Sequence, residues 1–274
     1  MRALISQFVK IYADKLPIIG LKILRAGESI FNIVLIQDMI NPRLIDFFYN
    51  RQKGWIDGTT LFIDIVKRYC NLNSVVLDLG AGSGQGKPQS YSIKGLVKVS
   101  IGVDINKDLY KNEIIDKKVL GDAYNLPFQK EAFDLIYADY VLEHIRQTQD
   151  FVEEVRRVLK KGGFFIFRTP NLYHYVPLIA KAMPKLCKSA LANYRFKRRS
   201  FPAFYKMNTV RELKKLFFEN GFSVERLQLI EKEPSYLMFN ILPFLIGVLY
   251  ERMVNFTELL VFLRSNIIGV FKKY

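Results

Sequence analysis

The sequence feature that most constrains this chain is a glycine-rich loop that directly follows a short apolar run. The apolar run covers residues 75–79, and the loop reads Asp78-Leu79-Gly80-Ala81-Gly82-Ser83-Gly84. A short apolar run that ends at glycines predicts a strand buried on both faces rather than a helix. Glycines at this point let the backbone turn sharply and approach a ligand closely. The loop therefore predicts a buried sheet with a ligand site at a strand end.

Further apolar runs continue the pattern along the chain, each of a length typical of a buried strand. They cover residues 99–103, 118–120, 133–137, 164–167 and 222–230. Helices are predicted before, between and after them, at 59–69, 151–159 and 209–220. Alternating strands and helices predict a mostly parallel sheet with right-handed connections. We therefore predict an α/β fold with a Rossmann-like sheet flanked by helices over residues 59–235.

Three segments lie outside this alternation. Residues 1–58 are predicted to form a helical N-terminal extension, and residues 236–274 an apolar, helical C-terminal tail. Residues 171–206 are predicted to be a basic insertion in the α/β domain. From residue 175 to 215, eleven Lys or Arg stand against one acid, Glu212. Such a segment attracts anions, although a solvated basic face explains the same composition.

The chain carries little sign of export or of a bound metal. Lys10, Asp14 and Lys15 interrupt the apolar residues at the start, so no signal peptide is predicted. The two cysteines, Cys70 and Cys187, match no disulfide or metal pattern, so no metal site is expected. Apolar stretches near the C-terminus are interrupted by polar residues, which disfavours a membrane span. We expect a cytoplasmic protein with peripheral contact at the inner face of an anionic membrane.

Four of the predicted strands have an acidic residue at or just beyond their carboxyl ends. These acidic residues are Asp78, Asp104, Asp122 and Asp139. In an open α/β sheet, ligands bind at the carboxyl ends of the strands, so these acids are expected to share one edge. The dinucleotide pattern G-x-G-x-x-G would need a glycine where Gln85 stands. An acid at Asp78 suits an amino-acid group better than two phosphates, which favours S-adenosylmethionine (SAM) over NAD.

Two of these acids have a specific predicted partner on the cofactor. Asp104 follows the second strand, where a carboxylate can accept hydrogen bonds from both ribose hydroxyls. Its alternative role is to cap the segment that follows. Asp122 could accept a hydrogen bond from the adenine amine, with the backbone of Ala123 nearby. Its alternative role is that of a turn residue after Gly121.

Residues 75–170 resemble the ubiquinone-biosynthesis-type (type 11) branch of class I SAM-dependent methyltransferases. The motifs that carry the resemblance are residues 76–84, 101–104, 121–123 with 126–128, 133–136, 141–144 and 158–163. The resemblance implies a seven-stranded sheet with one antiparallel strand near its edge, and SAM as cofactor. It implies cofactor contacts at Asp78, Gly80, Ala81, Gly82, Asp104, Ile105, Asp122 and Ala123, and near Asp139 and Tyr140. The sequence departs from the family after Gly84, where Pro88 would disturb the expected helix.

Methyl transfer is an in-line displacement in which the protein mainly positions and desolvates the reactants. A general base is needed only for a poor nucleophile. The two candidates are His144, which could instead pack beneath the cofactor, and His174, which follows the fifth strand where an acceptor pocket would open.

The basic insertion and the apolar tail suggest an amphiphilic or anionic small-molecule acceptor, such as a lipid-linked sugar, a quinone precursor or a phospholipid. Nucleic acid is disfavoured because no RNA-binding module accompanies the basic residues. Two alternatives stay open from sequence alone: an NAD-dependent oxidoreductase, and a non-catalytic, membrane-associated binding protein of the same fold.

Overall fold

The computed structural model describes residues 42–49, 54–182, 202–238 and 240–274. Most of the predicted N-terminal extension (residues 1–41 and 50–53) lies outside these ranges, as do residues 183–201 of the predicted basic insertion. The described part of residues 1–58 contains the short helix α2 (Pro42–Phe48). Of the insertion, the structure describes helix α5 (Tyr175–Ala182) and residues 202–206.

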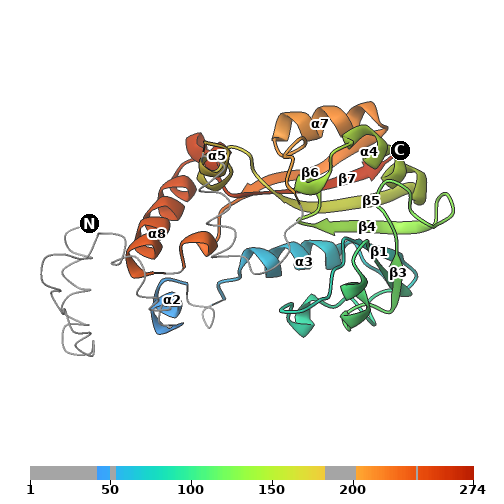
Figure 1. Ribbon diagram of the computed structural model, residues 1–274, viewed down its shortest axis with the longest axis horizontal. Helices are drawn as coiled ribbons and strands as arrows, with labels where there is room; N and C mark the ends of the chain where they lie inside the picture. Colours follow the sequence, from blue (N-terminus) through green and yellow to red (C-terminus); the bar gives the residue numbers. More distant parts are fainter. Residues whose placement is uncertain (1–41, 50–53, 183–201, 239) are drawn as a thin grey trace, which may run out of the picture. The chain divides into compact units, whose positions relative to one another are not determined.

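A seven-stranded sheet forms the centre of the described part (Figure 1). Its strands are β1 (Val75–Leu79), β2 (Val99–Asp104), β3 (Lys117–Leu120), β4 (Phe133–Asp139), β5 (Leu159–Pro170), β6 (Phe222–Ile230) and β7 (Asn266–Lys273). They lie in the order β3-β2-β1-β4-β5-β7-β6, and β7 runs antiparallel to both of its neighbours. This confirms the predicted Rossmann-like, mostly parallel sheet with its antiparallel strand next to the edge.

Helices cover both faces of the sheet. α3 (Gly58–Arg68) packs on one face, and α4 (Thr148–Val158) and α7 (Val210–Glu219) pack on the other (Figure 1). α3 begins where the Asp57 carboxylate accepts hydrogen bonds from the backbone N–H groups of Thr59 and Thr60. The remaining elements are η3 (Gln89–Tyr91), η4 (Lys107–Lys111), η5 (Leu142–His144), η6 (Ser235–Leu237), α8 (Ile241–Phe256) and η7 (Glu258–Leu263).

An aromatic cluster joins α7 to the sheet. Phe217 stacks on Phe165 and Phe167 with ring centroids 5.5 and 5.8 Å apart, and Phe271 of β7 stacks on Phe167 at 5.5 Å. All four rings are fully buried. Stacked pairs of this kind add about 0.5–1.5 kcal/mol each beyond the burial of their area. The antiparallel strand β7 is thereby an integral part of the core.

The structure corrects the prediction of a wholly helical C-terminal tail. Residues 241–256 do form helix α8, but residues 266–273 form β7, which pairs with β5 and β6 along their lengths. Because β7 is covered on both faces, its apolar residues form a continuous run without the alternation that identifies a half-buried strand. No helix among the described residues is long and apolar enough to cross a membrane.

Candidate functional site

A pocket of about 320 Å³ opens at the carboxyl ends of β1, β2 and β4. β1 lies between β2 and β4, so this is the place where the strand order reverses and where open α/β sheets bind ligands. Seven of the predicted site residues line the pocket: Gly80, Asp104, Ile105, Asp122, Ala123, Tyr140 and His144. Asp78, Ala81, Gly82, Asp139 and His174 do not line it.

The glycine loop forms one wall of this pocket and is fixed to the end of β2. The N–H groups of Gly80 and Ala81 both donate to the Val103 carbonyl, at 2.8 and 3.0 Å. Gly80 has a φ of +75°, and a Cβ at this position would collide with the Val141 side chain. Gly82 also has a positive φ, of +56°, but a Cβ there would meet nothing within 4 Å. Thus Gly80 is required for packing, whereas Gly82 leaves open space beside the backbone.

Asp104 connects this loop to the segment after β2. One carboxylate oxygen accepts from Gly82 N–H at 3.0 Å, and the other accepts from Asn106 N–H at 2.8 Å. A carboxylate has about four lone-pair directions, so each oxygen retains one for a further donor. The residue can therefore stabilise the loop and still accept from two vicinal hydroxyls in the pocket.

Asp122, Ala123 and Ile105 form another part of the pocket wall. The Asp122 carboxylate accepts from Tyr124 N–H at 3.0 Å, which makes it a turn residue as well as an exposed acceptor at the pocket. Ile105 is exposed despite its apolar side chain. An exposed apolar side chain beside hydrogen-bond acceptors suits the flat face of a purine base.

Asp78 lies behind the loop and is almost fully buried. Among the described residues, neither carboxylate oxygen has a hydrogen bond of normal geometry, although the Tyr137 hydroxyl is near enough to help lower its pKa. Burial has the larger effect and raises the pKa of Asp78, while Lys87 acts against this rise. A buried acid without a good partner is costly, so the site suits a cationic group such as an α-ammonium.

The chain after Gly84 does not enter an α-helix, in line with the departure seen in the sequence. Gly84 accepts from Lys87 N–H at 3.1 Å, and after Pro88 only the short helix η3 follows before β2. The Lys87 ammonium lies 4.5 Å from the centre of the Tyr91 ring. This loop therefore holds a cation close to Asp78.

Asp139 forms an ion pair with Arg168 next to the pocket. Its carboxylate accepts two hydrogen bonds from the Arg168 guanidinium, at 2.7 and 2.9 Å, and one from the Tyr91 hydroxyl at 2.6 Å. The same guanidinium lies 4.5 Å from the centre of the Tyr140 ring. Tyr140 has a φ of +58°, a strained value for a non-glycine residue, and it lines the pocket. Asp139 is thus placed to fix Tyr140 rather than to face the cavity.

His144 lies in the pocket wall on η5, next to the buried Glu143. Its Nδ1 is 3.0 Å from the Pro202 carbonyl, and its Nε2 is 4.0 Å from a Glu143 carboxylate oxygen. A carbonyl can only accept, so Nδ1 carries a proton and the lone pair of the neutral ring is on Nε2. Burial raises the pKa of Glu143 to about 7.

His174 lies away from this pocket and is buried. Its ring packs on Tyr175 and Tyr250, with ring centroids 4.1 and 5.6 Å away. Its Nε2 faces Glu231 at 3.6 Å. Burial lowers the pKa of His174 to about 4 and raises that of Glu231 to about 8, so both side chains are mainly neutral at neutral pH.

Arg168, Tyr91 and Pro202 are among the residues of the site that were not predicted from the sequence. Arg168 was the most visible of the three, since it is a charged residue at the end of the apolar run 164–167. Tyr91 and Pro202 lie in segments without a regular pattern, and only the folded chain brings them to Asp139 and His144.

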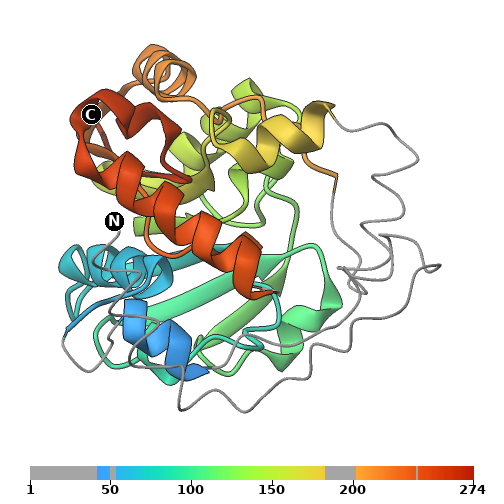
Figure 2. The same ribbon diagram turned by 90° about the vertical axis from the view of Figure 1, so that its left-hand side faces the viewer.

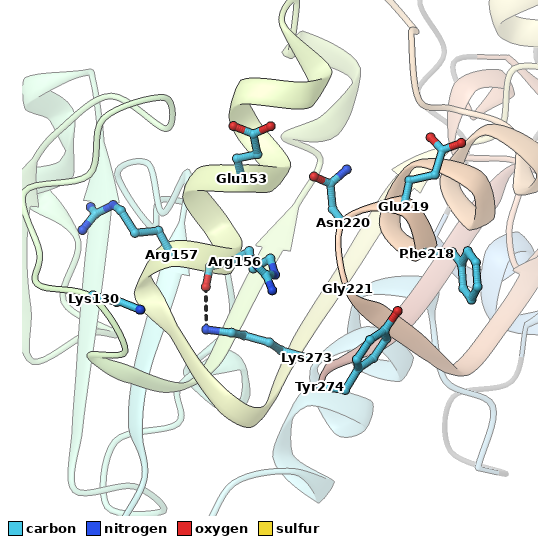
Figure 3. Close-up of a pocket in the computed structure, with 10 residues that line it drawn as sticks. All are labelled: Lys130, Glu153, Arg156, Arg157, Phe218, Glu219, Asn220, Gly221, Lys273 and Tyr274. Atoms are coloured by element: carbon cyan, nitrogen blue, oxygen red, sulfur yellow. Dashed lines mark hydrogen bonds between the residues drawn. The ribbon is translucent and has the colours of Figure 1, made fainter.

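A larger hollow, of about 680 Å³, lies at the C-terminal ends of α4 and α7 (Figure 3). It is rich in charge, but two of its cations, Lys273 and Arg157, already serve the fold. The Lys273 ammonium donates to the carbonyls of Arg156 and Leu159, and Arg157 is paired with Glu154 at 2.7 Å. None of the strand ends that form the glycine-loop pocket contributes to it. We therefore assign the functional site to the smaller pocket.

Known proteins that are similar to this chain include methyltransferases. Residues 77–167 match the family described as the methyltransferase domain. An uncharacterised methyltransferase of Bacillus subtilis is 30% identical over 138 residues, which are 47% of this chain and 52% of the relative. The chain therefore spans about half the length of that relative. A demethylmenaquinone methyltransferase of Oceanobacillus iheyensis is 24% identical over 64% of this chain and 78% of its own length.

Among solved structures, a SAM-dependent methyltransferase of Methanosarcina mazei superimposes with a TM-score of 0.52. It is 17% identical, and the match covers 76% of this chain and 96% of that structure. The seven-stranded sheet of this chain and that structure share the Rossmann-like fold. Residues 77–167 of the chain are therefore similar to a methyltransferase domain, and this similarity supports SAM as the cofactor.

Proposed function

We propose that this chain is an enzyme that transfers a methyl group from SAM to a small amphiphilic or lipid-linked acceptor with a protic nucleophile. When bound, SAM supplies the methyl group and the sulfonium leaving group. Asp104 and Asp122 would hold its ribose and adenine from the pocket wall. The relative named as a demethylmenaquinone methyltransferase supports an acceptor of this amphiphilic kind.

Asp78 and Lys87 are the groups that we propose for the amino-acid end of the cofactor. Asp78 offers a buried carboxylate that suits an ammonium, and Lys87 is a cation close to it. The α-ammonium of the cofactor would meet the Asp78 carboxylate, and the α-carboxylate on the same carbon would meet the Lys87 ammonium. The positive N-terminal end of an α-helix after the loop would attract the carboxylate of the cofactor. No such helix follows the loop, and the Lys87 ammonium would attract that carboxylate instead.

Ligand binding tests this assignment separately from catalysis. Calorimetry would compare S-adenosylhomocysteine with 5′-methylthioadenosine, which lacks the amino-acid group. Lys87→Met should weaken the first ligand about 10- to 150-fold, the range for one charge-assisted hydrogen bond, and leave the second unchanged. Lys98→Met, at an exposed lysine just before β2, is the matched control. Equal losses for both ligands, or none, would contradict the assignment.

His144 is the residue that we propose as proton acceptor, and the Nδ1 contact to the Pro202 carbonyl is the observation that carries this proposal. That contact orients the ring so that Nε2 can take a proton from the hydroxyl or amine that receives the methyl group. Glu143, 4.0 Å from Nε2, would stabilise the resulting imidazolium when ionised.

A methyl-transfer screen with labelled SAM over quinone precursors, lipid-linked sugars and phospholipids would test the activity. With an active acceptor, His144→Gln should lower kcat by about 10²- to 10⁴-fold while the dissociation constant of S-adenosylhomocysteine stays the same. His174→Gln is the matched histidine control and should retain kcat. Full kcat in His144→Gln would show that His144 is not the proton acceptor.

A further inference from the structure

Helix α8 is apolar on two opposite faces. One face is buried and includes Phe244, Val248 and Val254. The other carries large apolar side chains at intervals of three and four residues, all of them exposed: Leu242, Ile246, Leu249, Met253 and Phe256. A helix that is apolar all round is normally covered on all sides. In Figure 2, α8 crosses the side of the described part that faces the viewer.

The exposed apolar residues continue beyond the end of the helix. Leu259 and Phe262 of η7 are exposed as well, and Phe256 and Leu259 reach 91% and 83% exposure. We call these seven residues the α8–η7 stripe. An apolar surface of this extent marks an interaction site rather than a random set of exposed side chains.

A second hollow, of about 720 Å³, lies at one end of the stripe and shares Phe262 with it. Val261 and Leu229 add to its apolar lining, and Arg211, Lys214 and Lys215 of α7 form a basic rim. Among the described residues, only Lys215 of these three has a carboxylate within 4 Å, that of Glu219 at 3.9 Å.

Arg211 and Lys214 have no evident role in the stability of α7. Arg211 lies in the first turn, where the helix dipole favours acids over bases. An apolar surface that ends at a basic rim is complementary to an amphiphile with a negative head group. One acid, Glu258, is exposed on η7, and Arg264 lies within 3.4 Å of it and offsets its charge.

We propose that the α8–η7 stripe and the basic rim together bind the surface of an anionic lipid bilayer. The stripe enters the interface with α8 lying in the membrane plane, and Arg211, Lys214 and Lys215 contact lipid phosphates. A second copy of this chain is a poorer occupant, because each copy carries a net charge of +15. Residues 1–41 contain more Lys and Arg than Asp and Glu, so they do not neutralise the rim either.

Co-sedimentation of the full chain with vesicles tests the proposal without reference to methyl transfer. The vesicles are phosphatidylcholine alone, and equal parts of phosphatidylcholine and phosphatidylglycerol. We expect binding to the anionic vesicles that weakens as salt is added. The double variant Phe256→Ser with Leu259→Ser should bind at least about tenfold more weakly. The triple variant with Gln at Arg211, Lys214 and Lys215 should lose the preference for phosphatidylglycerol.

The matched control is Leu72→Ser with Leu96→Ser, at two exposed apolar residues outside the stripe and away from α7, and it should bind like the unchanged chain. No binding to anionic vesicles, or equal binding by all variants, would overturn the proposal. A dimer in sedimentation velocity that the stripe variant dissociates would assign the surface to a second copy. A melting temperature lowered well below that of the control variant would show that another part of the chain covers the stripe.

Discussion

Two buried acid–base pairs involve Arg168 in β5 and His174 shortly after it, and they differ in how they are held. Arg168 and Asp139, beneath the cofactor pocket, share two hydrogen bonds of 2.7 and 2.9 Å. His174 and Glu231, beside α8, approach only to 3.6 Å, and the His174 Nε2 has no hydrogen-bond partner in the described part of the chain. The first pair is ionised and geometrically fixed, whereas the second is mainly neutral at neutral pH.

The comparison shows that the partner that the fold places beside a buried acid decides whether the acid is ionised or neutral. Asp139 and Arg168 are direct partners in the register of β4 and β5, so their side chains meet on one face. Glu231 follows the end of β6 and meets a histidine whose pKa burial lowers to about 4. A neutral imidazole offers no charge to offset burial, so Glu231 retains its proton and its pKa rises to about 8.

Breaking the ionised pair should have the largest effect. Arg168→Leu leaves Asp139 buried without its cation and removes the guanidinium beneath Tyr140. We expect the free energy of unfolding to fall by about 3–5 kcal/mol, as for other broken buried pairs. Urea denaturation measures this, with Lys215→Ala, at an exposed pair, as a control that should cost at most about 1 kcal/mol. A loss below about 1 kcal/mol for Arg168→Leu would show that the pair contributes little.

Glu231→Gln should change the pH dependence of stability on the alkaline side. The folded chain holds a proton on Glu231 that the unfolded chain releases near the ordinary glutamate pKa of 4.5. The stabilising contribution is therefore fully present below about pH 4.5 and is lost as the pH rises through about 8. Between about pH 6 and about pH 9, the melting temperature should fall less in Glu231→Gln than in the unchanged chain. An unchanged slope would mean that Glu231 is ionised in the fold.

His174→Gln should have the smallest effect, with the opposite sign in pH. The folded chain releases the His174 proton more readily than the unfolded chain does, with a pKa of about 4 against 6.5. The contribution of His174 to the free energy of unfolding is fully present above about pH 6.5 and is lost as the pH falls through about 4. Below pH 6.5, the unchanged chain should lose stability faster than the variant in the same melting experiment. Parallel curves would argue that His174 is charged in the fold.

The strands of the parallel half were predictable because each is a short apolar run that ends in a glycine or an acid. β7 was not, because its residues between Ile267 and Phe271 are buried on both faces and give the same unbroken apolar run as a buried helix. The segment also lacks turn signals, and Gly269, which packs against the Phe167 ring, is its one irregular position.

The site was predictable where it depends on strand ends alone. Asp104 is the last residue of β2, Asp122 follows β3 after Gly121, and both aspartates line the pocket. Asp139 follows the same rule, yet Arg168 on the adjacent strand binds it, and that pairing depends on a register that no local pattern reveals. His174 was expected to face an acceptor pocket, but its path after β5 depends on contacts with Tyr250 and Glu231, far along the chain.

The position of β7 between β5 and β6 has a consequence for synthesis on the ribosome. β6 leaves the exit tunnel before β7 does, and in the finished sheet β6 pairs with β7 alone. The nascent chain therefore passes through a stage in which β6 has no partner and the edge of β5 is open. Such unpaired edges are where intermolecular strand pairing and aggregation begin. Completion of the sheet is thus delayed until translation of residues 266–273, and nascent-chain chaperones would be most needed in that interval.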